Sequence, residues 1–281
     1  MITMEKKELV ELLKDPVIRR LAVIYYVFDL PVNETMRDYC LAKSLNDIDP
    51  FCPYKQIDKP RNIKEFADQF KKAFWISLRA QRFGRKNKVL DSATKDMELW
   101  LEDRFKKIED DLNINDLTLP TFYAAFWKDV DFGASVFNKK VDTDSPSTAE
   151  QLVKAFRKSF ERFKHFREKK AALFTKFVIY FFNLFSDKEK YIKFLEVPSD
   201  THVKAVVKNV WNLQQTPSFD MIQKCATSLY TYDKALLPID LDLVMPLRSN
   251  ITPALTKALG ASDNIVALHR KLCKLPALDR S

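Results

Sequence analysis

The sequence predicts an all-α fold, and two observations support that prediction. Apolar residues recur three or four positions apart through most of the chain, whereas the alternating pattern of a β-strand is almost absent. Glycine occurs only 3 times in 281 residues, about 1%, where average usage is roughly 7%. Tight hairpins and phosphate-binding loops depend on glycine, so this scarcity disfavours Rossmann and P-loop proteins.

Several helices are predicted in the first half of the chain. The first begins at Pro16, because proline fits the first turn of a helix, and it ends near Pro31. The next two cover residues 62–83 and 91–110, where apolar side chains recur at helical steps. A polar linker at residues 138–148 is the most conspicuous break in this pattern.

A pair of helices joined by a tight turn is predicted in the middle of the chain. Ser147 and Glu150 have the spacing of a capping box, which predicts a helix start there. The turn at residues 165–168 then leads into the apolar segment 171–185. Residues 154–170 hold eight Lys and Arg against two acidic residues. Such a basic helix pair can dock on the phosphate backbone of a nucleic acid.

The overall charge and the cysteines narrow the function classes. The chain has 47 Lys and Arg against 38 Asp and Glu, a net charge of +9, which fits a polyanionic partner but also occurs in proteins that have none. The four cysteines form no CxxC pair and no Cys/His cluster, so no metal and no cofactor is expected. Scattered reduced thiols are typical of a cytosolic protein, so we expect a cytoplasmic location, associated with the nucleoid in a prokaryote.

Neither the chain start nor its longest apolar stretch indicates a membrane protein. The first residues carry charges and have no apolar signal core. The apolar segment 171–185 is shorter than the ~20 residues that cross a bilayer, and it contains Lys176. We therefore expect a buried helix and no membrane partner.

A proline and an aspartate precede valines at helical spacing in the segment 197–207, VPSDTHVKAVV. Pro198 prevents a helix from continuing from upstream, so Asp200 is expected to be an N-cap. An aspartate fixed at a helix start also stays ionised and oriented, and it can assist an attacking amine or stabilise a developing cation. His202 is expected to be a capping contact rather than a metal ligand, because no His or Cys partner is near it in sequence.

Residues 198–206, PSDTHVKAV, resemble the aspartate-bearing motif of the helix-hairpin-helix DNA glycosylases, the endonuclease III superfamily. In that superfamily Asp-Thr-His-Val opens a helix after a proline-containing loop. A lysine also begins the second helix of the hairpin, followed by small and apolar residues, and Lys169 with the segment 170–173 occupies that place.

Three further features, which follow one another along the chain, resemble the archaeal-type 8-oxoguanine DNA glycosylase branch. The 31 positions from Lys169 to Asp200 are similar to the interval in that branch. A second lysine follows seven positions after the first, here Lys176, with an aromatic residue four beyond it. The late segment Pro-x-x-x-Asp, which precedes an apolar helix, matches residues 238–242 and places Asp242 at its end.

The resemblance implies a base-excision repair glycosylase with AP lyase activity that removes an oxidised purine, 8-oxoguanine first, from double-stranded DNA. Its fold would be helix-hairpin-helix glycosylase-like, with two helical subdomains, 1–60 plus 186–281 and 61–185, and the site in the cleft between them. The protein is expected to act as a monomer.

The resemblance also implies a role for individual residues. Lys169 would attack the sugar C1′ atom and form a Schiff base, and Asp200 would assist it. Arg167 and Lys170, which crowd this lysine, would favour the neutral amine. Lys176 and Asp242 would line the base pocket. The expected DNA phosphate contacts are Arg162, Lys164, Arg167 and Lys170.

Two departures and several alternatives stay open. The sequence KHFREKK replaces the Gly-rich hairpin of most superfamily members, and Pro246 stands where the branch has a base-contacting tryptophan. Lys169 lies in a basic run, where a lysine is usually only solvated; Lys176 could extend to the surface, and Asp242 could cap the next helix. The alternatives for the whole chain are a non-catalytic DNA-binding module on the same scaffold and a basic helical protein that binds a protein or RNA.

Overall fold

Every regular element in the described part of the chain is a helix, which confirms the all-α prediction. The structure is a computed structural model that describes residues 3–28, 60–79, 88–111, 122, 125–126, 146–161, 163, 166–182, 184 and 188–278. The chain forms two compact units: unit 1 comprises residues 1–56 and 196–281, and unit 2 comprises residues 57–195. The predicted subdomains are divided at residues 60 and 185, and the two compact units at residues 56 and 195.

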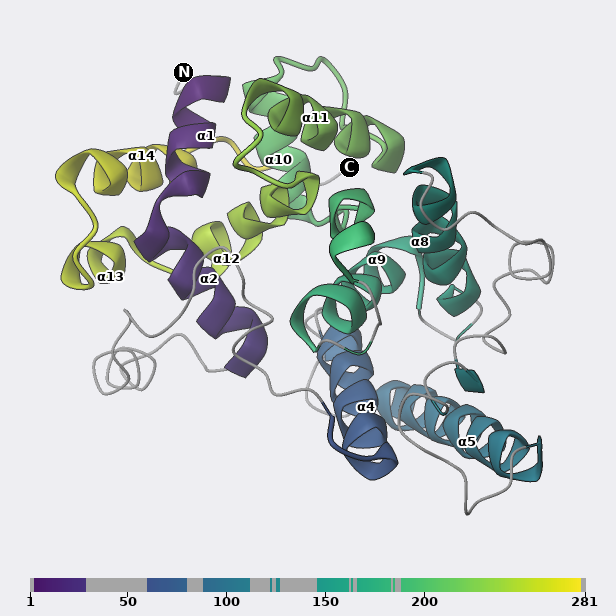
Figure 1. Cartoon of the computed structure of the whole chain (residues 1–281). Helices are drawn as coiled ribbons and strands as arrows, with labels where there is room; N and C mark the ends of the chain where they lie inside the picture. The colour runs from purple at the N-terminus through teal and green to yellow at the C-terminus, as the bar shows by residue number, and fades with distance from the viewer. Residues whose placement is uncertain are drawn as a thin grey trace. The chain divides into compact units, whose positions relative to one another are not determined.

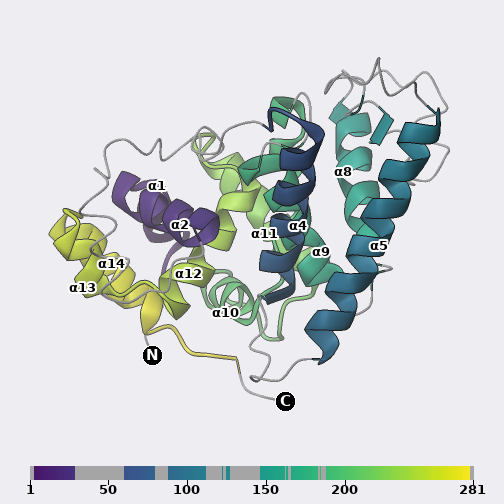
Figure 2. The ribbon, with the colours of Figure 1, turned by 90° about the horizontal axis from the view of Figure 1, so that it is seen from below.

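Unit 1 combines the N-terminal helices with the C-terminal third of the chain (Figure 1). Within it α14 packs on α1, α12 and α13, and α10 packs on α11 and α12 (Figure 2). Its helices are α1 (Lys6–Lys14), α2 (Pro16–Phe28), α10 (Thr201–Val210), α11 (Phe219–Tyr232), the 3-10 helix η7 (Pro238–Leu243), α12 (Val244–Ser249), α13 (Pro253–Ala258) and α14 (Asp263–Cys273).

The core of unit 1 is mostly aliphatic and contains several buried polar groups. Arg19 and Asp240 form a buried ion pair at 3.0 Å, and the Arg19 guanidinium also donates to the Leu13 carbonyl at 3.1 Å. The fully buried His269 ring has its Nε2 atom 2.8 Å from the Leu247 carbonyl oxygen. Burial lowers the pKa of His269, so this imidazole favours its neutral form.

Unit 2 contains the helices whose sequence lies between the two segments of unit 1. Here α9 packs on α8 and α4, and α4 packs on α5. Its helices are α4 (Ile63–Arg79), α5 (Lys88–Asp111), α8 (Pro146–Phe160), α9 (Glu168–Lys176), the π-helical turn η4 (Phe177–Phe181) and the 3-10 helices η5 (Lys188–Lys190) and η6 (Ile192–Phe194).

Phenylalanine rings fill the core of unit 2. Phe174 of α9 is fully buried, and its ring lies 4.7 Å from that of Phe160, 5.2 Å from Phe70 and 5.7 Å from Phe166, measured between ring centroids. Such edge-to-face and tilted pairs add to the free energy of apolar burial. The phenylalanines at helical spacing in residues 62–83 and 152–163 therefore contribute to one aromatic core.

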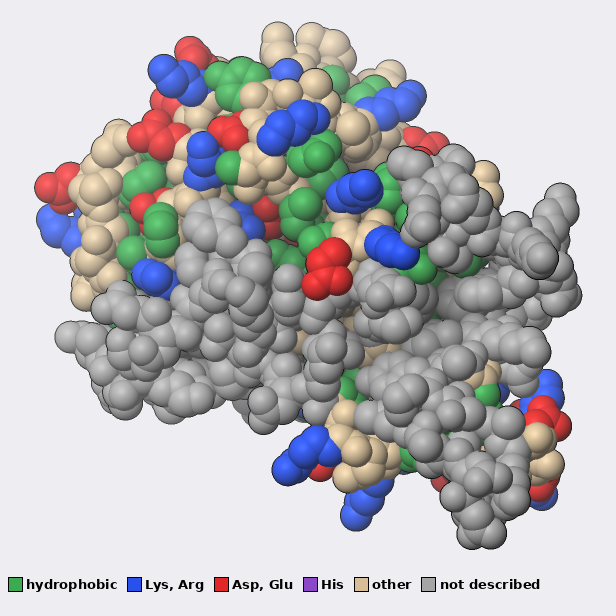
Figure 3. Space-filling view, in the orientation of Figure 1, with side chains coloured by type: hydrophobic (Ala, Val, Ile, Leu, Met, Phe, Trp, Pro, Cys, Tyr) green, Lys and Arg blue, Asp and Glu red, His purple; other side chains and the backbone are tan. Residues whose placement is uncertain are grey.

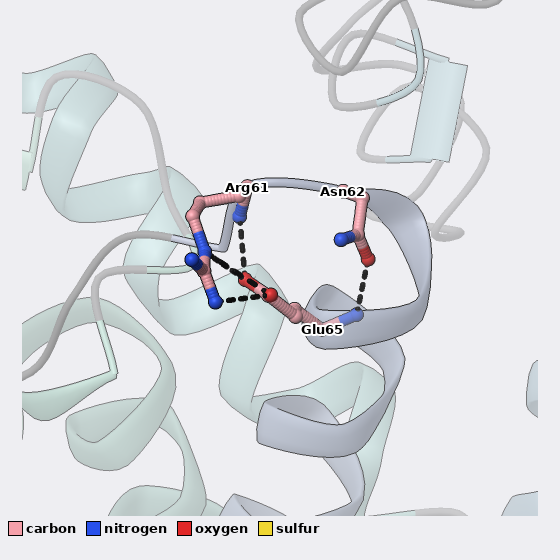
Figure 4. A network of polar contacts seen from close by, with 3 residues as sticks. All are labelled: Arg61, Asn62 and Glu65. Carbon is pink, nitrogen blue, oxygen red and sulfur yellow. Dashed lines mark hydrogen bonds and ion pairs between the residues drawn. The ribbon is translucent and has the colours of Figure 1, made fainter.

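A capping network fixes the start of α4 (Figure 4). Asn62 Oδ1 accepts from the backbone N–H of Glu65 at 2.9 Å, and the Glu65 carboxylate accepts from the Arg61 backbone N–H at 2.8 Å. Hydrogen bonds from the Arg61 side chain and backbone lower the pKa of Glu65. An asparagine with a glutamate three positions later is the sequence signal for this helix start.

Several predicted boundaries differ from the structure, and α5, predicted at residues 91–110, spans Lys88–Asp111. The helix predicted to start at Ser147 begins at Pro146, because proline is favoured at the first helical position and needs no backbone N–H there. The segment 171–185 is predicted to be one buried helix; its described residues are buried, but α9 ends at Lys176 and the turn η4 follows. π-Helical turns are rare and often lie at functional sites.

The described surface of unit 1 carries charges of both signs, which are interspersed on the face shown in Figure 3. Lys14 pairs with Asp233 at 2.8 Å, and Lys271 pairs with Glu8 at 2.6 Å. None of the described helices is both long enough and apolar enough to cross a membrane.

Candidate active site

The lysine predicted to be the nucleophile lies in the first turn of α9. Arg167 is the N-cap residue, and Lys169 is the second residue of the helix and half-buried. Lys170, directly after it, is only 2% exposed. The two lysines and the small and apolar residues after them thus lie at the start of a helix.

Lys170 lies in an environment that disfavours a charged amine. Burial lowers its pKa to about 8, and the neighbouring positive charge of Lys169 contributes to this shift. The like-charge effect is predicted for Lys169, whereas the shift described here is that of Lys170. An amine with such a pKa is partly neutral at physiological pH, which is the form needed for attack on carbon.

Lys176 does not extend to the surface. Its side chain is 1% exposed, and its Nζ atom lies 5.2 Å from the centroid of the Phe181 ring. Tyr180, in the π-helical turn η4, is also buried. The open alternative of a lysine that reaches solvent is therefore wrong, and Lys176 is an interior residue of unit 2.

The four predicted phosphate contacts differ in their surroundings. Arg167 is exposed at the N-cap of α9, whereas Lys170 is buried. Because a buried amine cannot contact a phosphate backbone at the surface, Arg167 is the better candidate of these two. Arg162 and Lys164 lie outside the described residues.

Asp200 is the N-cap of α10, as its position after Pro198 predicts. Its Oδ1 atom accepts from the backbone N–H of His202 at 2.6 Å, and the side chain is mostly buried, with 8% of the residue exposed. The Asp200 N–H in turn donates to the Pro198 carbonyl at 2.8 Å. The capping contact expected of His202 is thus made by its backbone.

Gln223 of α11, which no sequence pattern singles out, holds the loop before Asp200. Its side-chain amide donates to the Val197 carbonyl at 2.9 Å and accepts from the Val197 N–H at 2.7 Å. Two bonds to one residue fix both the position and the direction of the loop. Local sequence contains no signal for this contact, because Gln223 lies 26 positions from Val197.

Arg248 is a second residue that sequence reasoning missed. It lies in the last turn of α12, and its guanidinium donates to the carbonyls of His202 and Leu275. It is also close enough to Asp200 for a favourable Coulomb interaction. No motif indicates it, because a basic residue in a last helical turn is common.

Asp242 is buried in the 3-10 helix η7, with 1% of the residue exposed. The alternative that it caps the next helix is wrong, because Leu243 is the N-cap residue of α12. Pro246, at the position where the glycosylase branch has a tryptophan, is buried within α12.

The candidate residues are divided between the two units. Lys169, Lys170 and Lys176 belong to unit 2, and Asp200 and Asp242 belong to unit 1. The described part of the chain contains no group of three or more His, Cys, Asp or Glu that could hold a metal ion.

No protein-family model matches the chain, and no curated protein or solved structure matches it significantly. A function for this protein must therefore be inferred from its own residues.

Proposed function

We propose that this protein is a DNA glycosylase with AP lyase activity that removes an oxidised purine, 8-oxoguanine first, from double-stranded DNA. The observation that carries the proposal is a pair of helix starts. Lys169 lies in the first turn of α9, and the largely buried carboxylate of Asp200 caps α10. These residue types, at these positions and in this order, are the ones that the resemblance requires.

The proposed reaction begins when the damaged nucleotide is flipped out of the duplex, because its C1′ atom cannot be reached within the base stack. The neutral amine of Lys169 attacks C1′, and the bond from C1′ to the base breaks, so that the base leaves with the electron pair. Ring opening then gives a Schiff base, and loss of a proton from C2′ expels the 3′ phosphate by β-elimination.

Asp200 has two proposed roles in this sequence. Its carboxylate accepts a proton from the attacking lysine, and it stabilises the positive charge that develops on the sugar. Both roles require an ionised carboxylate in a fixed orientation. The bond from the His202 N–H to Oδ1 and the Gln223 contacts to the preceding loop support such an orientation.

The remaining residues have proposed supporting roles. Lys176 and Asp242 are proposed to recognise the base, and their burial fits a recess better than a surface. Exposed Arg167, with Arg162 and Lys164, is proposed to bind phosphates, which makes the affinity for duplex fall as salt rises.

Borohydride trapping on a duplex with a single 8-oxoguanine tests this proposal. The wild-type chain should give a covalent protein–DNA adduct, and Lys169→Ala should abolish it. Lys224→Ala, which removes an exposed lysine of α11, is the matched control and should trap like the wild type.

Two other outcomes of these DNA experiments would support the alternative functions. Duplex binding that weakens with salt, without an adduct on a panel of lesions, would support the non-catalytic DNA-binding module. A lack of duplex binding at low salt would support the protein or RNA interaction protein.

A further inference from the structure

Arg248 connects the first turn of α10 to the segment that follows α14. Its Nη1 atom donates to the His202 carbonyl at 3.5 Å, and its Nη2 atom donates to the Leu275 carbonyl at 2.8 Å. The planar guanidinium presents these donors in a fixed fork, so the two acceptors are held in one geometry. One side chain thus ties together two segments that are far apart in sequence.

The same peptide segment carries the contacts of both Arg248 and Asp200. The His202 N–H donates to Asp200 Oδ1 at 2.6 Å, while the His202 carbonyl accepts from Arg248. A displacement of this turn therefore moves the donor that orients the carboxylate. The positive guanidinium also attracts the Asp200 carboxylate through space.

Arg248 occupies this position at a cost in stability. Its Nε atom is buried without a hydrogen-bond partner among the residues that the structure describes. Burial lowers the pKa of Arg248, and the charges of Cys273 and Asp200 oppose this effect. Polar groups that are buried with incomplete hydrogen bonding are uncommon and are often associated with function.

We propose that Arg248 is a positioning residue for Asp200, which holds the first turn of α10 and thereby the capping carboxylate. This inference rests on the proposed function for its effect on the reaction. Arg248 does not contact the reacting atoms; it acts through the His202 peptide and through its charge. Its removal should therefore slow the chemical step and leave DNA binding unchanged.

The test compares Arg248→Met, Arg248→Lys and a control, Arg270→Met, which removes an exposed arginine of α14. In single-turnover trapping on 8-oxoguanine duplex, Arg248→Met should lower the rate constant about 10- to 100-fold, since small displacements of a catalytic group have effects of this size. The dissociation constant for the duplex should stay within about twofold of the wild-type value, because phosphate contacts elsewhere supply most of the affinity. Arg248→Lys keeps the charge and should recover part of the rate.

Amide hydrogen exchange provides a readout that does not depend on any reaction. The amides of His202 and Val203 should exchange faster in Arg248→Met than in Arg270→Met. Unchanged exchange, or an unchanged trapping rate, would overturn the positioning role. If the wild type forms no adduct, the proposed function fails, while faster exchange would still support the hold on α10. If Arg248→Met does not fold, Arg248→Lys decides by the same two measurements.

Discussion

The cores of the two units differ, since phenylalanine rings fill much of the core of unit 2, whereas the core of unit 1 is mostly aliphatic. In unit 2, Lys170 and Lys176 are buried, and phenylalanine rings make up much of the core. In unit 1, Asp200 and Asp240 accept specific hydrogen bonds in a mostly aliphatic core. Burial lowers the pKa of Lys170, whereas specific hydrogen bonds orient the two carboxylates.

The proposed reaction uses Asp200 of unit 1 and the half-buried Lys169 of unit 2, which directly precedes the buried Lys170 in α9. A lysine nucleophile needs a neutral amine, which a poorly solvated environment favours. A carboxylate that assists it needs charge and direction, which backbone donors provide. The comparison can be tested by weakening the aromatic core, by breaking an ion pair of unit 1, and by removing a buried lysine of unit 2.

The largest expected effect is on the aromatic core. Phe174→Ala removes a fully buried ring, so we expect the free energy of unfolding to fall by about 3–5 kcal/mol. Val206→Ala, in the aliphatic core of unit 1, should cost about 2 kcal/mol because only two methyl groups are lost. Urea denaturation followed by tryptophan fluorescence measures both. A loss below about 1 kcal/mol for Phe174→Ala would contradict the packing described for unit 2.

A slightly smaller effect is expected from the buried ion pair of unit 1. Asp240→Ala leaves the Arg19 guanidinium buried without its carboxylate, and we expect a loss of about 3 kcal/mol in the free energy of unfolding. The double variant Arg19→Met, Asp240→Leu removes both charges and should recover most of that loss. Equal destabilisation of the single and double variants in urea titrations would show that the charge pairing is not the cause.

The smallest effect concerns Lys170, and it depends on pH. Its pKa is about 8 in the folded protein and 10.5 in its ordinary state, so the unfolded chain binds more protons between these values. The free energy of unfolding therefore falls as pH falls from about 10.5 to about 8, and the penalty is fully present below that window. Lys170→Met should remove the penalty and stabilise the protein at pH 7 by on the order of 2 kcal/mol.

Urea titrations at pH 7 and at about pH 10 measure this effect, since most of the window lies between these two values. The advantage of Lys170→Met should be large at pH 7 and smaller at the higher pH. Lys158→Met, which replaces an exposed lysine of α8, is the matched control and should show no such change. An advantage that is the same at both pH values would contradict the burial of a titrating amine.

Local signals in the sequence predict much of the helical structure. Pro198 and Asp200 mark the start of α10. The Pro198 ring restricts its own backbone, and the Asp200 side chain accepts a hydrogen bond from the residue two positions later. The predicted start of α8 differs from the observed one by one residue, since Pro146 competes with the capping-box pattern of Ser147. The exact first residue of such a helix depends on small differences in how strongly neighbouring residues favour a helix start.

Burial and long-range contacts could not be predicted in the same way. Arg19 and Asp240 are 221 positions apart, and Arg248 reaches a carbonyl 46 positions before it. The sequence predicts the packing of α8 on α9 but not that of α4 on α9. Residue type and local spacing contain no information about these neighbours, so Gln223 and Arg248 were missed.

Mapping of the borohydride-trapped residue tests the central claim most directly. The trapped complex is digested, and the lysine that carries the sugar remnant is identified by mass spectrometry, in the wild type and in Asp200→Asn. We predict that the remnant lies on Lys169 and that Asp200→Asn traps far more slowly while it still binds the duplex. A remnant on another residue, or an unchanged rate in Asp200→Asn, would contradict this claim.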